Sequence, residues 1–389
     1  MMLTHWCNLL TICNYKKAVG YLIIGTTIAI TLGLWLYTLS DVTIFWSDPF
    51  LCASKITILA GTIAMCWTFF LATRLPIFNT MLGGLDKVYH IHKTMGKLSY
   101  SCVILHILFQ CLRHFPDMQA MAQLFIPPEV GGLAFGIAAF ILFTLLLAFT
   151  LWIPIPYHIW KRTHELFIVV LLLSFLHMYF INKHINASSV LSLWIYGWIA
   201  LAAISYVYIR FLYYYIGPRY PYTITEIHSL RSNSTNANNT QTWNITLAAD
   251  HKKMAYQPGQ FIYVSFVSRS VTPEVHPYSI SSYPSQKDIR LSIKSLGDHT
   301  QTLSSLNSGD TALLWGPYGK FYEPYLYQEN RDAVMIAGGI GITPFLSLLG
   351  YEAHNPHNRK TFIFYCPLFL LVSTRGLCPI DWQPREKNT

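Results

Sequence analysis

Six long apolar segments dominate the first 215 residues of this chain. Crossing the roughly 30 Å hydrocarbon core of a bilayer takes about 20 apolar residues in a helix. Six stretches meet that requirement: residues 18–38, 52–72, 94–112, 131–153, 163–182 and 190–214. Of the 389 residues, 53% are hydrophobic and only 12% are charged, a balance typical of multi-pass membrane proteins. We therefore predict a six-helix transmembrane bundle over residues 1–215.

Basic residues flank the apolar segments unevenly. Lys and Arg outnumber Asp and Glu by 27 to 18, but they form no single patch. We therefore expect membrane lipid, and not nucleic acid, as a partner. One side of the bundle carries Lys16, Lys17, Arg74, Lys87, Lys93, Lys161, Arg162, Arg210 and Arg219, and the other has only Arg113 and Lys183. The positive-inside rule then predicts that both termini face the cytoplasm. The oligomeric state cannot be predicted from these features.

Four histidines lie within or beside the third and fifth predicted spans. His92 and His106 are fourteen residues apart, and His164 and His177 are thirteen apart, which gives separations of about 21 and 20 Å along a helix. Because these two spans run in the same direction, His92 is predicted to lie level with His164, and His106 with His177. A neutral imidazole is a suitable axial ligand for haem iron. Two pairs at two depths therefore predict two haems.

The spacing also poses a geometric difficulty. At 100° per residue, thirteen residues leave a side chain about 140° from the starting face of a helix. His177 therefore requires a bent or locally distorted helix, or a haem approached from another side. A lone intramembrane histidine could instead bond a neighbouring carbonyl, and several could relay protons in a transporter. The matched depths favour haem ligation, whereas a transporter predicts no Soret band.

From about Gly217 the sequence becomes typical of soluble domains. Period-two strands such as 242–247 and 260–266 alternate with Pro, Gly and Asn turns. This pattern predicts an antiparallel β-barrel over residues 216–324. The polar stretch 231–242 between two of its strands is interpreted as a long hairpin loop or a disordered excursion, without an assigned function.

The pattern changes again in residues 325–389. An apolar strand at 333–337 is followed by a glycine turn, a helix and a second strand at 361–365. This alternation predicts the beginning of an α/β nucleotide-binding domain.

Five short motifs occur in this second half of the chain. They are HPYSISS at 276–282, RLSIK at 290–294, GDHT at 297–300, GPYG at 316–319 and AGGIGITP at 337–344. A flavin requires an aromatic face, a hydroxyl near its reactive nitrogen and backbone amides for its pyrophosphate. Tyr278, Ser279, Ser282 and the turn from Gly297 to Thr300 could provide these. Gly338, Gly339 and Gly341 suit phosphate approach at a helix N-terminus, although they do not form the spaced GxGxxG motif.

The two histidine spacings and the motif order resemble the membrane flavocytochromes of the ferric reductase and NADPH oxidase superfamily, over residues 50–366. The resemblance implies that NAD(P)H reduces FAD, that the inner haem b (His92 and His164) passes electrons on, and that the outer haem b (His106 and His177) reduces an external acceptor. That acceptor would be a ferric iron chelate or dioxygen. It implies no catalytic side chain besides the cofactor ligands. The implied FAD and NAD(P)H residues are His276, Pro277, Tyr278, Ser279, Ile280, Ser281, Ser282, Lys294, Gly297, Thr300, Gly316, Gly319, Gly338, Gly339, Gly341, Thr343 and Pro344.

The chain departs from that family after Cys366. The nucleotide domain of the family continues through further strands and helices, whereas residues 367–389 show no such alternation. Residues 325–389 are also fewer than the roughly 100 residues typical of a domain. We therefore expect a truncated nucleotide domain, and the alternative function is an inactive haem-binding membrane relic.

Overall fold

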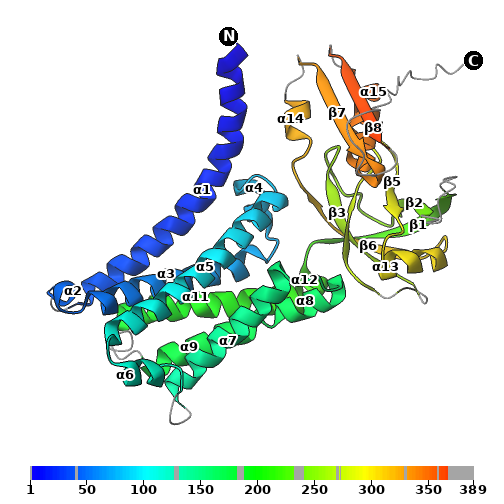
Figure 1. Cartoon of the computed structure of the whole chain (residues 1–389). Coiled ribbons are helices and arrows are strands. Elements are labelled where there is room, and N and C mark those ends of the chain that lie inside the picture. The colour runs from blue at the N-terminus through cyan, green and yellow to red at the C-terminus, as the bar shows by residue number, and fades with distance from the viewer. Residues whose placement is uncertain are drawn as a thin grey trace, which may run out of the picture. The chain divides into compact units, whose positions relative to one another are not determined.

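The computed structural model describes residues 2–39, 43–126, 131–181, 188–231, 241–268, 271, 273–327, 331–356 and 359–366. The chain divides into two compact units, Met1–Tyr215 and Ile216–Thr389, which are considered separately below (Figure 1). The predicted polar loop falls mostly on residues 232–240, outside the described residues. The same holds for the tail at 367–389.

The first unit is helical. Its helices are α1 (Met2–Tyr37), α2 (Ile44–Ser47), α3 (Pro49–Leu71), α4 (Pro76–Met81), α5 (Leu85–His114), α6 (Met118–Gln123), α7 (Gly132–Leu151), α8 (Tyr157–Glu165), α9 (Phe167–Ile181), α11 (Ser189–Val207), the π-helical turn η1 (Tyr208–Leu212) and α12 (Tyr213–Ile216). Within the described residues, six segments are long and apolar enough to cross a membrane: Ala18–Tyr37, Pro49–Leu71, Leu85–His114, Gly132–Leu151, His158–Ile181 and Ser189–Ile216. The six predicted apolar spans are confirmed.

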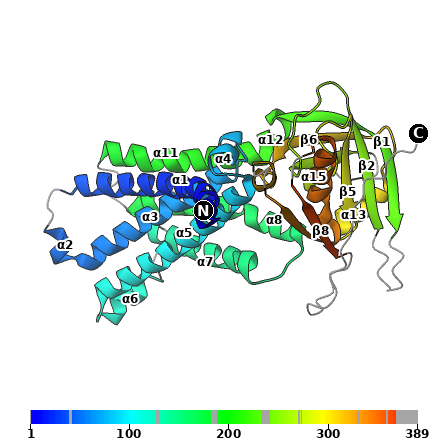
Figure 2. The same ribbon diagram turned by 90° about the horizontal axis from the view of Figure 1, so that it is seen from above.

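Small residues let neighbouring helices of this unit approach closely. α3 packs along α5 (Figures 1 and 2), and α7 packs along α9 (Figure 1). A Cβ at Gly61 on α3 would lie 2.8 Å from Cβ of Cys102 on α5, and one at Gly132 on α7 would lie 2.7 Å from the side chain of Ile181 on α9. Because helices in a bilayer associate through such close packing, these glycines fix the two helix pairs that carry the histidines.

The fifth span contains the distortion that the thirteen-residue spacing requires. The α-helix is interrupted at Leu166, between α8 and α9. The N–H of Leu166 donates to the carbonyl of Thr163 at 3.1 Å, and that of Val169 donates to the carbonyl of Leu166 at 2.9 Å. Bonds over three residues tighten a helix locally. This break lies between His164 and His177 and changes the faces on which they lie.

The second unit begins with an antiparallel sheet. Its strands are β1 (Arg219–Arg231), β2 (Gln241–Ala249), β3 (Phe261–Val267), β4 (His276–Ser279), β5 (Ile289–Lys294) and β6 (Thr311–Tyr318), in the order β4-β3-β6-β1-β2-β5. Short helical segments α13 (Asp298–Thr302) and η2 (Leu303–Ser305) lie between β5 and β6. Alternate side chains of these strands, among them Ile224, Ile245 and Leu291, form a fully buried core.

The predicted antiparallel β-barrel is confirmed as an antiparallel sheet, but the barrel does not close. The ladder is open between its edge strands β4 and β5, where an isolated bridge pairs Ile280 with Leu291. The N–H of Ser281 donates to the carbonyl of Arg290 at 2.9 Å. β4 is only four residues long and contains Pro277, which has no N–H to donate. It therefore cannot continue the ladder along β5.

A small α/β element follows the sheet. After α14 (Glu323–Leu326) come β7 (Ala333–Gly338), the short turn η3 (Gly339–Ile342), α15 (Thr343–His354) and β8 (Thr361–Cys366), and β7 pairs with β8 in parallel. The hydroxyl of Ser347 on α15 donates to the carbonyl of Ser282 at 2.5 Å, and the ring of Tyr283 stacks on that of His354 at 4.3 Å. These contacts dock the predicted nucleotide-binding segment onto the end of the HPYSISS motif.

Candidate functional site

His92 and His164 face each other across the helical unit. Their ring centroids are 6.1 Å apart and their planes are tilted by 49°. The ring of His164 also stacks on Trp160 at 5.1 Å and meets the edge of Phe167 at 5.0 Å. The structure therefore brings together the pair that was predicted at one depth, and aromatic neighbours fix the orientation of one of its rings.

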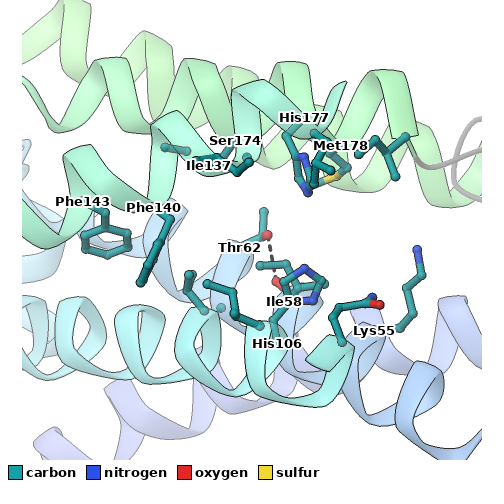
Figure 3. A pocket seen from close by; sticks show the side chains of 18 of the residues that line it. Lys55, Ile58, Thr62, His106, Ile137, Phe140, Phe143, Ser174, His177 and Met178 are labelled. Carbon is teal, nitrogen blue, oxygen red and sulfur yellow. Dashed lines mark hydrogen bonds between the residues drawn. The ribbon is translucent and has the colours of Figure 1, made fainter. Parts of the chain in front are cut away.

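His106 and His177 lie on opposite walls of a cavity of about 470 Å³ (Figure 3). The lining is mostly apolar, with Phe140, Phe143 and other side chains from α3, α5, α7 and α9. A pocket of this size and character is suited to a largely apolar planar ligand. The second predicted pair is thus also brought together, at the other end of the same helices.

The two predicted ligands on α5, His92 and His106, direct Nδ1 at backbone carbonyls of α3. His92 Nδ1 lies 2.9 Å from the Thr68 carbonyl oxygen, and His106 Nδ1 lies 3.1 Å from that of Ser54. A carbonyl can only accept a hydrogen bond, so Nδ1 carries the proton in both residues. The lone pair of Nε2 is consequently available to a metal.

The histidines of the fifth span follow the same rule. His177 Nδ1 lies 2.8 Å from the Gly132 carbonyl oxygen. His164 Nδ1 lies 3.3 Å from the hydroxyl of Thr150, which already donates its own hydrogen to the carbonyl of Leu146. That hydroxyl therefore accepts from Nδ1. Among the described residues, none bonds to Nε2 of any of the four histidines.

These features fit bis-histidine haem ligation. Two metal–nitrogen bonds of about 2 Å place facing imidazole centres roughly 6 Å apart, as found for His92 and His164. Histidine ligands of metals commonly donate their other N–H to a carbonyl or similar group, which fixes the tautomer.

Two further residues shape the cavity between His106 and His177. A Cβ at Gly136 would lie 2.5 Å from Nδ1 of His177, so only glycine lets α7 approach that ring. Lys55 lines the same cavity and is half-buried (Figure 3), and no acidic partner for it occurs in the described part of the chain. An unpaired cation in a membrane span calls for an anionic partner.

The predicted flavin motifs also converge, within the second unit. Phe261 of β3 pairs with Ser279 of β4 and with Tyr318 of β6, which brings HPYSISS beside GPYG. The rings of His276 and His299 stack at 4.1 Å, which adds the GDHT turn. Lys294 lies half-buried at the end of β5, the strand bridged to Ile280.

Several buried polar atoms in this region lack a partner. They are the hydroxyl of Tyr278 and both ring nitrogens of His299, none of which has a hydrogen-bond partner within the described residues. Burial, with the nearby charge of Glu274, raises the pKa of Tyr278. Burial, with His276 beside it, lowers the pKa of His299. Unpaired buried polar groups are costly, so this cluster fits a polar ligand such as FAD.

Two predicted ligands have structural partners instead. The Ser282 hydroxyl accepts from the N–H of Arg290 and bonds the Tyr256 hydroxyl, both at 2.9 Å. The Thr300 hydroxyl accepts from the N–H of Gly297 at 3.0 Å and closes the turn before α13. In this structure both hydroxyls stabilise the turns in which they lie. That they also bind the pyrophosphate of FAD stays a prediction.

The glycine-rich segment leaves its backbone open at the start of α15. Gly339 has a φ of +52°, and a Cβ at Gly339 or Gly341 would meet no atom within 4 Å. Thr343 and Pro344 begin α15, and the Thr343 hydroxyl donates to the carbonyl of Ile340 at 3.0 Å. Gly338 ends β7. This arrangement leaves room for a phosphate group near a helix N-terminus.

The glycines of the GPYG motif serve close packing. Gly316 and Gly319 have φ of +138° and +86°, and a Cβ at Gly319 would lie 3.1 Å from the ring of Phe261. Both support the junction of β6 with β3.

One carboxylate and two imidazoles lie close enough to be considered as a metal site. The ligand atoms of Glu274, His276 and His299 are within 4.8 Å of one another. However, the two rings are stacked with only 23° between their planes, and a nitrogen lone pair lies in the plane of its ring. The two lone pairs therefore do not converge on a common ion.

The residues that sequence reasoning missed are the supports of the histidines. Thr68 and Gly132 act through backbone carbonyls, which carry no signature in sequence. Thr150 acts through its hydroxyl, and Ser54 through both its hydroxyl and its carbonyl. Lys55 could have been found, because a cation within an apolar span is itself unusual.

Two family comparisons cover most of these elements. Residues 57–175 match the ferric reductase like transmembrane component, and residues 227–337 match an FAD-binding domain. The first match includes His92, His106 and His164, and the second includes the first four flavin motifs in full.

The chain belongs to the ferric reductase and NADPH oxidase superfamily. As a superfamily member with six apolar helices, it is an integral, multi-pass membrane protein with an FAD-binding domain.

Individual relatives of this superfamily member match over shorter stretches. Dual oxidase 1 of Caenorhabditis elegans is 35% identical over 107 residues, 25% of this chain and 7% of the relative. Sulfhydrogenase 2 subunit gamma of Pyrococcus furiosus is 31% identical over 114 residues, 29% of this chain and 38% of the relative. The chain covers less than half the length of each. Among solved structures, the ferredoxin-NADP+ reductase of Plasmodium falciparum has a TM-score of 0.33 at 19% identity, over 39% of this chain and 59% of that one, too low to establish a common fold.

Proposed function

We propose that this protein is a transmembrane oxidoreductase that moves electrons from cytoplasmic NAD(P)H, by way of FAD and two bis-histidine haems b, to an acceptor outside. The observation that carries the proposal is the shared geometry of four intramembrane histidines. Each donates from Nδ1 to a neighbouring helix, and the His92 and His164 rings have the separation that one iron between them requires.

The residues of the chain supply position and orientation. When bound, FAD exchanges a hydride for single electrons, and haem iron carries electrons singly. α5 holds His92 and His106 at two depths, and the distorted fifth span holds His164 and His177 opposite them. Thr68, Ser54, Gly132 and Thr150 keep the four rings in the tautomer that presents Nε2.

The second unit would hold the flavin and the nicotinamide nucleotide on the cytoplasmic side. The unpartnered Tyr278 hydroxyl and His299 ring support flavin binding, and the open glycine backbone before α15 supports a phosphate. The excess of basic residues on one side of the spans supports cytoplasmic termini.

The test is an absorption spectrum of the purified full-length protein together with iron per chain. We expect two low-spin haems, and replacing His92 or His177 with Leu should remove one of them. His90→Leu is the matched control for His92→Leu, because His90 is an exposed histidine of α5, the helix that carries His92. It should keep both haems. A wild-type protein without a Soret band would overturn the proposal.

Two acceptors are consistent with this site. The relatives named as dual oxidases favour dioxygen, and the ferric reductase family favours a ferric chelate. Dye reduction that superoxide dismutase abolishes would identify the oxidase, and dismutase-insensitive ferrozine colour would identify the reductase. If NADPH does not bleach the flavin of a preparation that retains FAD and haem, the inactive relic replaces both.

A further inference from the structure

Ser54 makes an unusual set of contacts with His106. Its side chain is fully buried on α3, and its hydroxyl oxygen lies 2.7 Å from His106 Nδ1 and 3.3 Å from the His106 carbonyl oxygen. The side-chain amide of Gln110, one turn further along α5, donates to the same hydroxyl at 3.0 Å. The Ser54 carbonyl lies 3.1 Å from Nδ1 as well.

Only one assignment of hydrogens satisfies this network. A serine hydroxyl has one hydrogen and two lone pairs. Nδ1 must carry a proton, because the Ser54 carbonyl beside it can only accept. The hydroxyl therefore accepts from Nδ1 and from Gln110, and it donates its own hydrogen to the carbonyl of His106.

This network distinguishes His106 from the other three histidines. Within the described residues, Nδ1 of His92, His164 and His177 has a single acceptor each, at 2.9, 3.3 and 2.8 Å. Nδ1 of His106 has two acceptors, and the nearer one is a side chain at 2.7 Å. Of the four imidazoles, His106 is the most strongly polarised at Nδ1.

Hydrogen bonding of Nδ1–H increases the basicity of the opposite nitrogen as a metal ligand. A more basic axial ligand stabilises the oxidised iron and lowers its reduction potential. We infer that Ser54 is a positioning residue whose hydroxyl, acting through His106, lowers the reduction potential of the haem between His106 and His177. This inference rests on the proposed function.

The test is a redox titration of both haems in the purified full-length Ser54→Ala variant. We expect two haems per chain, a positive shift in the midpoint potential of one, and no shift in the other. Ser205→Ala is the matched control, because Ser205 is a buried serine of α11 whose hydroxyl, among the described residues, bonds only a carbonyl of its own helix. It should leave both potentials at their wild-type values.

If Ser54→Ala loses the haem between His106 and His177, the same redox titration is made on Ser54→Cys. Sulfur is a weaker acceptor than the hydroxyl, so the retained haem should again titrate at a more positive potential. Unchanged potentials in a variant that keeps both haems, or loss of both haems together as in misfolding, would overturn the inference. A wild-type protein without haem would instead refute the proposed function.

Discussion

Gly136 of α7 lies against the ring of His177 so closely that a Cβ there would be 2.5 Å from Nδ1 and 2.6 Å from the adjacent ring carbon. Nδ1 of the same ring donates to the carbonyl of Gly132, which lies one turn earlier on α7. α7 therefore determines where His177 can point, although it carries no proposed ligand itself.

Gly136→Ala is expected to displace His177 and to remove the haem of that pair. Overpacking of a close contact costs about 1–3 kcal/mol, whereas helix propensity alone would favour alanine by about 1 kcal/mol. Haem per chain, measured from the pyridine haemochrome, should fall from two toward one. Gly197→Ala on α11, where a Cβ meets nothing within 4 Å, is the control and should keep both haems. Equal haem content in the two variants would contradict the packing argument.

The spans and the histidine pairs could be predicted from sequence because both depend on simple periodicity. The spacing of His164 and His177 also predicted a distortion such as the interruption at Leu166, because thirteen residues do not return a regular helix to the same face. The supports of the histidines could not be predicted. The carbonyls of Thr68 and Gly132 are available at any residue type, and only the helix packing decides which of them meets an imidazole.

The antiparallel strands of the second unit could be predicted, but closure into a barrel could not, because strand periodicity does not indicate whether two edge strands pair. Pro277 and the short length of β4 decide this, and Pro277 was interpreted only as part of a flavin motif. The motifs themselves converge as their order in the chain implied. However, the hydroxyls of Ser282 and Thr300 bond within the protein, which no spacing argument could have anticipated.

Lys55→Met is expected to weaken retention of the haem between His106 and His177. The two carboxylates of haem b would be suitable anionic partners for a cation in this cavity, and a methionine of similar length keeps the packing while removing the charge. We expect faster loss of one haem to apomyoglobin, by roughly tenfold for a lost contact of about 1.4 kcal/mol. Lys55→Arg should retain the haem, and so should Lys97→Met, at an exposed lysine of α5. Identical release from Lys55→Met and wild type would refute the pairing.

The stability of the FAD-bound protein is expected to decrease in acid because of His299. Burial and the neighbouring His276 hold the pKa of His299 below the ordinary value of about 6.5, so the folded state favours the neutral ring. Its contribution to stability is fully present above about pH 6.5 and is lost as the pH falls toward the lowered pKa. Thermal unfolding of the FAD-bound protein followed by flavin fluorescence should show this decline, and it should be smaller in His299→Gln, which cannot titrate. If the variant keeps the pH dependence of the wild type, His299 is not the group responsible for the decline.

Arg359→Met is expected to loosen the α/β element without affecting the haems. The Arg359 side chain is almost fully buried, 3.7 Å above the ring of Tyr325, with a guanidinium nitrogen 2.6 Å from the carboxylate of Glu352 on α15. Removing one member of such a buried pair typically costs about 3–5 kcal/mol, because the other charge is left uncompensated.

Hydrogen exchange of the backbone between residues 333 and 366 should therefore accelerate strongly in Arg359→Met. Reduction of the flavin by NADPH should slow in parallel, while the Soret band stays at its wild-type intensity. Lys360→Met, at the exposed neighbouring position, removes a positive charge without breaking the buried pair and should leave exchange and flavin reduction unchanged. Unaltered exchange in Arg359→Met would show that the pair does not hold β8 to α15, and a loss of haem would show that the two units depend on each other for stability.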